Sequence, residues 1–256
     1  MEIDMTEFYD PVLYDLRVGP GSRVGILYLS EAKKGSGPIL ELGCGTGDVL
    51  LPIAEAGFEV AGLDASKAML DKFRERISSE APALVKDIDL VEGRMESFSL
   101  NRKFGQIFIP NDGVAHLLEG QSLRSALRSC YDHLIPGGRL ILDISFFDVQ
   151  YLGRYVGGER ENLRDRGCFP LNDNGAVQVW EQTQFDQDAG ILTAKFRYEY
   201  LDSSRNVTRT YYRQLLLCPR RPSEVALALE IIGFSDIRIE RLIGEGNQGW
   251  VLRANR

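Results

Sequence analysis

The sequence has few residues of the kinds that bind metals or form disulfides. Its 256 residues include two histidines and four cysteines, and no two cysteines form a CxxC pair. Isolated thiols of this kind are typical of reduced, structural cysteines, and so few histidines argue against a zinc site. We therefore expect a cytoplasmic protein without a metal.

Basic clusters and long apolar runs are missing as well. Lysine and arginine number 30 against 37 acidic residues, for a net charge of −7, and no basic run is present that could bind a phosphate backbone. No apolar run approaches a membrane span, and residues 1–4 are acidic where a signal peptide would be basic. We expect a small molecule as the partner, and neither nucleic acid nor a membrane. The protein could form a homodimer.

Glycine is the residue that stands out in what remains. Residues 39–48 read ILELGCGTGD, an apolar run with one acid followed by glycines at every second position. This pattern predicts a strand that stops abruptly and turns into a helix. Glycine lets a ligand lie directly on the backbone and enters a turn of positive φ without steric cost. We expect residues 43–47, the glycine loop, to hold a nucleotide-like cofactor.

Strands and helices alternate after the glycine loop. Apolar residues at helical spacing predict helices between successive apolar runs, and Ser66 is placed to cap one of these helices. The further strands expected are residues 58–63, 88–91, 106–109 and 139–144. Five strands alternating with helices predict an α/β fold with a parallel, doubly wound sheet.

The pattern changes between residues 177 and 217, where apolar and polar residues alternate with period two. Three antiparallel strands are expected there, at residues 175–187, 191–202 and 206–217. A helix then begins at Pro222, and two last strands at residues 237–243 and 250–253 resume the first sheet. The three-stranded block is therefore an insertion.

Two classes of cofactor use a strand, a glycine loop, a helix and a second strand that ends in an acid. Dinucleotide enzymes need G-x-G-x-x-G, whose third glycine allows close packing of helix and strand. Here the spacing is G-x-G-x-G, and Asp48 occupies the third-glycine position, where its charge would repel a pyrophosphate. Glu41 suits a cationic ammonium, and Asp64 can accept hydrogen bonds from both ribose hydroxyls. A cofactor with an amino-acid end, a ribose and no phosphate is S-adenosylmethionine.

These residues carry a resemblance to a known family. ELGCGTG at residues 41–47, GLDAS at residues 62–66, FGQIFIPNDGVAHL at residues 104–117 and LIPGGRL at residues 134–140 resemble the motifs of class I S-adenosylmethionine-dependent methyltransferases. The resemblance is strong over residues 36–145 and loose elsewhere. It implies a Rossmann-like sheet of seven strands, mostly parallel with the last strand antiparallel, and a three-stranded antiparallel insertion after strand five.

The resemblance also implies a division into domains. An N-terminal helical cap would comprise residues 1–35, and the cofactor-binding domain would comprise residues 36–145 and 222–256. The insertion, residues 146–221, would form a substrate lid.

Individual residues acquire roles from the same resemblance. The implied cofactor-binding set is Glu41, Gly43, Cys44, Gly45, Asp64, Ala65, Met69, Arg94, Met95, Glu96 and Pro110. The first four would contact the methionine part, Asp64 the ribose, and the residues from Ala65 to Glu96 the adenine. The family usually has an acid at position 94, where this chain has Arg94. Either Glu96 replaces that acid, or the adenine amino group bonds to the backbone.

One subgroup of this family combines three features that this chain also has: a tyrosine–aspartate pair near the start, a histidine at the position of His116, and the insertion. In these features the chain resembles small-molecule N-methyltransferases, such as those acting on nucleotide-linked amino sugars or on glycine. An amine must react in its neutral form, and His116 can take its proton; the alternative is that His116 only fixes its own loop. His133, on a helical apolar stripe, is expected to be structural.

Further residues are expected at the acceptor. Asn111 and Asp112 end the fourth strand, where open α/β sheets bind ligands, and Asp112 can attract a cationic amine. By position alone, the other candidates are Tyr14, Phe146, Tyr212 and Arg213, for which core packing or a solvated face is the alternative. Arg213 could hold a carboxylate or phosphate bidentately.

The predicted function is transfer of a methyl group from S-adenosylmethionine to a small molecule, an amine in the first place, by direct displacement. O- or C-methylation of a phenol or a nucleotide-linked sugar is the second alternative. A catalytically silent cofactor-binding protein is the third. An oxidoreductase is disfavoured by Asp48.

Overall fold

The structure is a computed structural model that describes residues 11–18, 24–144, 152–156, 163–171, 174–244 and 247–256. The chain folds as two compact units. One unit comprises residues 1–19 and 148–219, and the other comprises residues 20–147 and 220–256.

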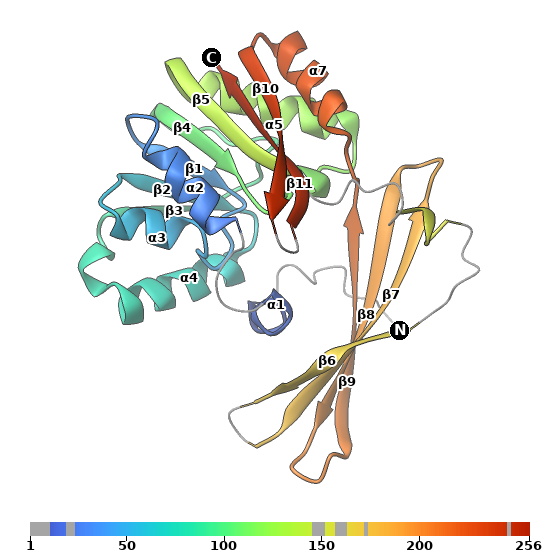
Figure 1. Cartoon of the computed structure of the whole chain (residues 1–256). Coiled ribbons are helices and arrows are strands. Elements are labelled where there is room, and N and C mark those ends of the chain that lie inside the picture. The colour runs from blue at the N-terminus through green and yellow to red at the C-terminus, as the bar shows by residue number, and fades with distance from the viewer. Residues whose placement is uncertain (1–10, 19–23, 145–151, 157–162, 172–173, 245–246) are drawn as a thin grey trace. The chain divides into compact units, whose positions relative to one another are not determined.

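The second unit contains a seven-stranded sheet (Figure 1). Its strands are β1 (Ile39–Leu42), β2 (Val60–Asp64), β3 (Ile88–Glu92), β4 (Phe104–Ile109), β5 (Leu134–Ile144), β10 (Ser235–Gly244) and β11 (Asn247–Asn255). They lie in the order β10-β11-β5-β4-β1-β2-β3. The first five strands pair in parallel, whereas β11 lies between β5 and β10 and is antiparallel to both. The predicted seven-stranded, doubly wound sheet with an antiparallel last strand is confirmed.

Helices cover both faces of this sheet (Figure 1). They are α2 (Gly25–Ala32), α3 (Leu50–Glu55), α4 (Lys67–Glu80), α5 (Gly120–His133) and α7 (Pro222–Ile232), with short 3-10 helices η2 (Pro82–Leu84) and η3 (Gly113–His116). One apolar core joins α2, α3 and α4 to one face, and a second core joins α5 and α7 to the other. Because both faces are covered, the four residues of β1 are all buried.

The starts of α4 and β5 can be compared with the prediction. Ser66 caps α4 as expected, since its Oγ accepts a hydrogen bond from Met69 N at 3.3 Å. The expected start of β5 at Arg139 is wrong, because the strand begins at Leu134, directly after α5. Residues 136–138, Pro-Gly-Gly, lie inside the strand, where its pairing with β4 shifts register.

The first unit contains α1 (Pro11–Val18) and a four-stranded antiparallel sheet (Figure 1). The sheet is formed by β6 (Arg164–Pro170), β7 (Ala176–Asp186), β8 (Ile191–Leu201) and β9 (Val207–Leu217), in that order. The last three strands match the predicted insertion, and β6 was not predicted. As an edge strand with a register shift after Asp165, β6 buries no residue fully and carries no alternating pattern that the sequence could reveal.

The N-terminal region divides at a different point from the predicted cap. Residues 20–35 belong to the second unit, because α2 buries Tyr28 and Ala32 in a core of the seven-stranded sheet. None of the described helices is long and apolar enough to cross a membrane.

Candidate functional site

The three glycines of the glycine loop have positive φ values, of 73° at Gly43, 51° at Gly45 and 88° at Gly47. They differ in what surrounds them. A Cβ added to Gly45 would have no atom within 4 Å, whereas a Cβ added to Gly47 would lie 2.1 Å from Cε2 of Phe73. Gly45 therefore leaves open space above the backbone, and Gly47 allows α4 to pack closely against the loop.

Two carboxylates flank this loop. Asp64, at the end of β2, accepts hydrogen bonds from Gly45 N through Oδ2 and from Ser66 N through Oδ1, each at 2.8 Å. Burial raises its pKa, although the two hydrogen bonds act in the opposite direction. Glu41 on β1 is 2% exposed, and its Oε2 makes no hydrogen bond to any described residue. Burial, and then the charges of Asp48 and Asp64, raise the pKa of Glu41 well above its ordinary value.

The structure corrects the electrostatic argument about Asp48. Arg76 on α4 donates from Nη1 to Asp48 Oδ1 at 2.6 Å and to the carbonyl oxygen of Thr46 at 3.3 Å. The charge of Asp48 is therefore neutralised by a cation 28 residues away, and repulsion of a pyrophosphate no longer follows. What remains of that argument is the missing third glycine of the dinucleotide motif.

The other residues of the cofactor-binding set lie around the loop in different ways. The thiol of Cys44 is buried, and a Cβ added to Gly62 would lie 2.7 Å from its Sγ. Met69 is buried on α4 and Ala65 is exposed beside it. The Cε of Met95 would lie 3.7 Å from a Cβ added to Gly43, so Met95 borders the loop.

Arg94 and Glu96 satisfy each other. Arg94 Nε donates to Glu96 Oε1 at 2.7 Å, with the arginine side chain 68% exposed and the glutamate 19%. Glu96 is thus already engaged by a cation, which weakens its case as the replacement for the acid at position 94.

The segment after β4 has an unusual backbone. Asn111 and Asp112 both have positive φ, of 55° and 58°, although neither is glycine. Their amides donate to the same carboxylate: Asn111 N to Asp143 Oδ1 at 2.9 Å, and Asp112 N to Asp143 Oδ2 at 3.1 Å. Tyr28 Oη donates to Asp143 Oδ1 at 2.7 Å, and Tyr28 is fully buried.

Asp143 and Tyr28 were not among the predicted site residues. The sequence held one signal for the first, an aspartate within the apolar run of β5. It held none for Tyr28, which is 115 residues away and resembles an ordinary core tyrosine. Burial raises the pKa of Asp143 to about 7, with Asp112 adding to the effect and Tyr28 opposing it.

Pro110 and the two histidines are placed as follows. Pro110 is buried and its carbonyl oxygen accepts from Gly113 N at 3.1 Å. His116 ends η3 and its side chain is exposed. His133 is 8% exposed, its Nε2 accepts from Leu100 N at 2.9 Å, and its Nδ1 lies 2.7 Å from Ser129 O. His133 is therefore a buried, hydrogen-bonded residue with a structural role, as expected.

The acceptor residues expected by position alone stay predictions. Tyr14 lies on α1, and Tyr212 and Arg213 on β9, all in the first unit; Phe146 lies outside the described residues. Because successive strand residues point to opposite faces, Tyr212 is registered with Arg197 on one face and Arg213 with Phe196 on the other. Tyr212 and Arg213 thus do not share a face, a point that the predicted strand already implied.

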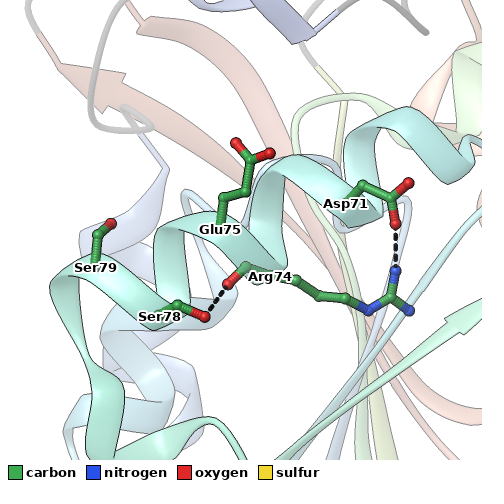
Figure 2. Close-up of a pocket in the computed structure, with 5 residues that line it drawn as sticks. All are labelled: Asp71, Arg74, Glu75, Ser78 and Ser79. Carbon is green, nitrogen blue, oxygen red and sulfur yellow. Dashed lines mark hydrogen bonds and ion pairs between the residues drawn. The ribbon is translucent and has the colours of Figure 1, made fainter.

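A shallow pocket lies along α4, lined by Asp71, Arg74, Glu75, Ser78 and Ser79 (Figure 2). Arg74 Nη1 donates to Asp71 Oδ1 at 2.9 Å, and Ser78 Oγ donates to the carbonyl oxygen of Arg74 at 2.8 Å. These bonds join neighbours on one helix. The pocket contains none of the predicted site residues.

Comparison with known proteins shows what this chain is similar to. Residues 39–138 match the family model described as a methyltransferase domain. Over 108 residues the chain is 32% identical to the protein of Bacillus subtilis (strain 168) named "Putative methyltransferase YqeM", covering 42% of each chain. Over 234 residues it is 28% identical to a dTDP-3-amino-3,4,6-trideoxy-alpha-D-glucopyranose N,N-dimethyltransferase of Streptomyces venezuelae, covering 78% of this chain and 93% of that one. The solved structure of the methyltransferase CcbJ from Streptomyces caelestis aligns with 98% of both chains at a TM-score of 0.72 and 22% identity.

Proposed function

Because residues 39–138 of this chain belong to the methyltransferase domain family, we propose that the protein transfers a methyl group from S-adenosylmethionine to the amine nitrogen of a small molecule. The observation that favours an amine as the acceptor is a group of four acids at the carboxyl ends of the parallel strands. They are Glu41, Asp64, Asp112 and Asp143, here called the acidic edge, and three of them are 2% exposed or less. The described partners of Glu41, Asp64 and Asp143 include no lysine or arginine. Such an edge favours ligands that arrive with positive charge.

The glycine loop and the two carboxylates that flank it, Glu41 and Asp64, support binding of the cofactor. Glu41 Oε2 is a buried acceptor without a described partner, as an incoming ammonium group would require. Asp64 uses two of the roughly four lone-pair sites of a carboxylate, which leaves acceptors for two ribose hydroxyls. The open space above Gly45 lets a ligand lie on the backbone.

The remaining cofactor contacts follow from the same placement. Gly43 and Cys44 would act through their backbone, since the thiol of Cys44 points into the core. Ala65, Met69 and Met95 would border the adenine, with Pro110 behind. The Arg94–Glu96 pair favours the backbone as partner of the adenine amino group.

The bound cofactor supplies a methyl group already activated on a sulfonium, so the chain needs to align the acceptor and exclude water rather than supply strong acid–base chemistry. An amine reacts in its neutral form, so an acceptor that arrives as a cation must lose a proton before its nitrogen can take up the methyl group. We assign that proton to an imidazole nitrogen of His116, which is exposed at the end of η3 next to the segment of Asn111 and Asp112. Asp112 would attract the acceptor as a cation.

The likeness to an amino-sugar N,N-dimethyltransferase supports a nitrogen acceptor and includes a nucleotide-linked sugar among the candidates. That Arg213, on β9 of the first unit, binds a carboxylate or phosphate stays a prediction from the sequence. The sequence has no basic run that would favour nucleic acid or a lipid surface as a partner. A homodimer stays a prediction, which analytical ultracentrifugation would test.

An acceptor panel tests the proposal. The full chain is incubated with S-adenosylmethionine and with a dTDP-linked amino sugar, glycine, a phenol or a dTDP-linked sugar without an amine. Release of S-adenosylhomocysteine and the mass of the product are then measured. We expect turnover with an amine and a product methylated on nitrogen. Turnover with the hydroxyl compounds alone would make it an O-methyltransferase, and cofactor binding without any turnover would favour the silent binding protein.

A further inference from the structure

The left-handed conformation of Asn111 and Asp112 requires an explanation from their surroundings. A single non-glycine residue with φ between 55° and 58° is uncommon, and here two follow each other directly after β4. Neither is held by a regular ladder, because β4 ends at Ile109. Such strain persists where neighbouring groups fix the backbone, and it occurs preferentially at functional sites.

The group that fixes it is the carboxylate of Asp143. Two successive backbone N–H groups in a turn form a small anion-binding concavity, and the carboxylate of Asp143 fills this concavity from the adjacent strand β5. The carboxylate is itself oriented, since Tyr28 Oη donates to Oδ1 from α2 while also lying 3.2 Å from Ile109 O. Asp143 is 1% exposed, so water does not compete for these bonds.

We propose that Asp143, oriented by Tyr28, is a positioning residue for the acceptor, because its charged carboxylate holds Asn111 and Asp112 in the conformation that presents them at the end of β4. The inference rests on the proposed function, in which these two residues face the acceptor. Asp143 itself does not contact reacting atoms.

The charge of Asp143 decides whether the concavity is filled. The groups that face it are Tyr28 on α2, the amides of Asn111 and Asp112 and the carboxylate of Asp112 beyond β4, while its registered neighbour on β11 is the apolar Val251. Burial raises the pKa of Asp143 to about 7, so both charge states are populated near neutral pH. Protonation removes one acceptor from the network and loosens the segment. Deprotonation restores both backbone bonds.

The test follows the amides directly. Amide resonances of Asn111 and Asp112 are recorded by 1H–15N NMR on the full chain between pH 5 and pH 9. We expect both to titrate with one midpoint near 7 and the titration to vanish in Asp143→Asn. Tyr28→Phe should raise the midpoint, because the lost hydrogen bond stabilises the charged form. Tyr198→Phe, another fully buried tyrosine but on β8, is the matched control and should leave the midpoint unchanged.

A second readout connects the network to the acceptor. With the amine found active in the panel, Asp143→Asn should raise the acceptor KM on the order of tenfold while Kd for S-adenosylhomocysteine, measured by calorimetry, stays near that of the wild type. Amides that do not titrate, or that titrate alike in Asp143→Asn, would overturn the proposal. So would an unchanged KM with a weakened Kd. If no amine is turned over but the amides titrate as expected, the proposed function fails while the Asp143 network stands.

Discussion

Replacing Gly47 with alanine tests whether this glycine is needed for close packing of α4 against the glycine loop, rather than for space that a ligand occupies. The added Cβ would lie 2.1 Å from Cε2 of Phe73, a fully buried ring of α4, and φ at this position is 88°. The strained φ costs about 1–3 kcal/mol. Overpacking against a ring that is enclosed on all sides costs about 1–3 kcal/mol more. The sum is about 2–6 kcal/mol, which lowers Tm on the order of 10 °C for a chain of this length.

Gly45→Ala is the control, since it has the same kind of backbone without the clash. Its φ is 51° and a Cβ there would have no atom within 4 Å. We expect a smaller loss of Tm and a marked loss of affinity for S-adenosylhomocysteine, because the methyl group occupies the space of the ligand. Gly47→Ala should show the reverse, a large loss of Tm with near-normal affinity at 20 °C.

Thermal unfolding and calorimetry of the two variants decide the matter. In the Gly47→Ala background, Phe73→Leu should recover part of the lost stability, because the smaller side chain relieves the contact. Gly47→Ala at least as stable as Gly45→Ala would refute the assignment of Gly47 to packing. Equal losses of affinity in both variants would refute the division of roles.

Three further predictions concern His116, Glu31 and Arg76. His116→Ala should lower kcat/KM for the amine most strongly near neutral pH and less at high pH, where the amine is already neutral; a uniform, small effect in the pH–rate profile would leave His116 a loop residue. For Glu31, burial alone would raise the pKa, but hydrogen bonds from Arg253, Lys34 and Arg139 lower it to about 2. The stability it contributes is therefore complete above about pH 4.5 and is lost as the pH falls through 2, so in urea unfolding Glu31→Gln should destabilise the protein most at pH 7, less at pH 3 and least near pH 2. Arg76→Gln should leave Asp48 unpaired and cost about 1–3 kcal/mol, whereas Arg74→Gln on the exposed face of α4 should cost little.

The sheet could be predicted because its signals are local. Each strand from Ile39 to Ile144 is a short apolar run followed by a turn or helix, and the alternation with helices restricts the topology. The long strands β7 to β9 show period two within their own sequence. β6 gives no such signal, because its seven residues include a register shift after Asp165 and none of them is fully buried.

The candidate site residues that the sequence could place are those that a local motif defines, and the residues it missed lie far away in the sequence. Glu41, Asp64 and the glycines lie at fixed distances from strand ends, so their placement follows from the motif. The partners of Asp48 and of the Asn111–Asp112 backbone are Arg76 and Asp143, which lie on other elements. These pairings join side chains and backbone groups of different elements, and a single sequence does not reveal which groups will meet.

The measurement that tests the account most directly is calorimetric titration of S-adenosylhomocysteine into the wild type, Asp64→Ala and, as a control, Asp71→Ala on the exposed surface of α4. The account predicts binding to the wild type and to Asp71→Ala with similar Kd. Asp64→Ala should bind roughly 10²-fold more weakly or worse, because two charge-assisted hydrogen bonds to the ribose are lost. Unchanged affinity in Asp64→Ala would contradict the cofactor site proposed here.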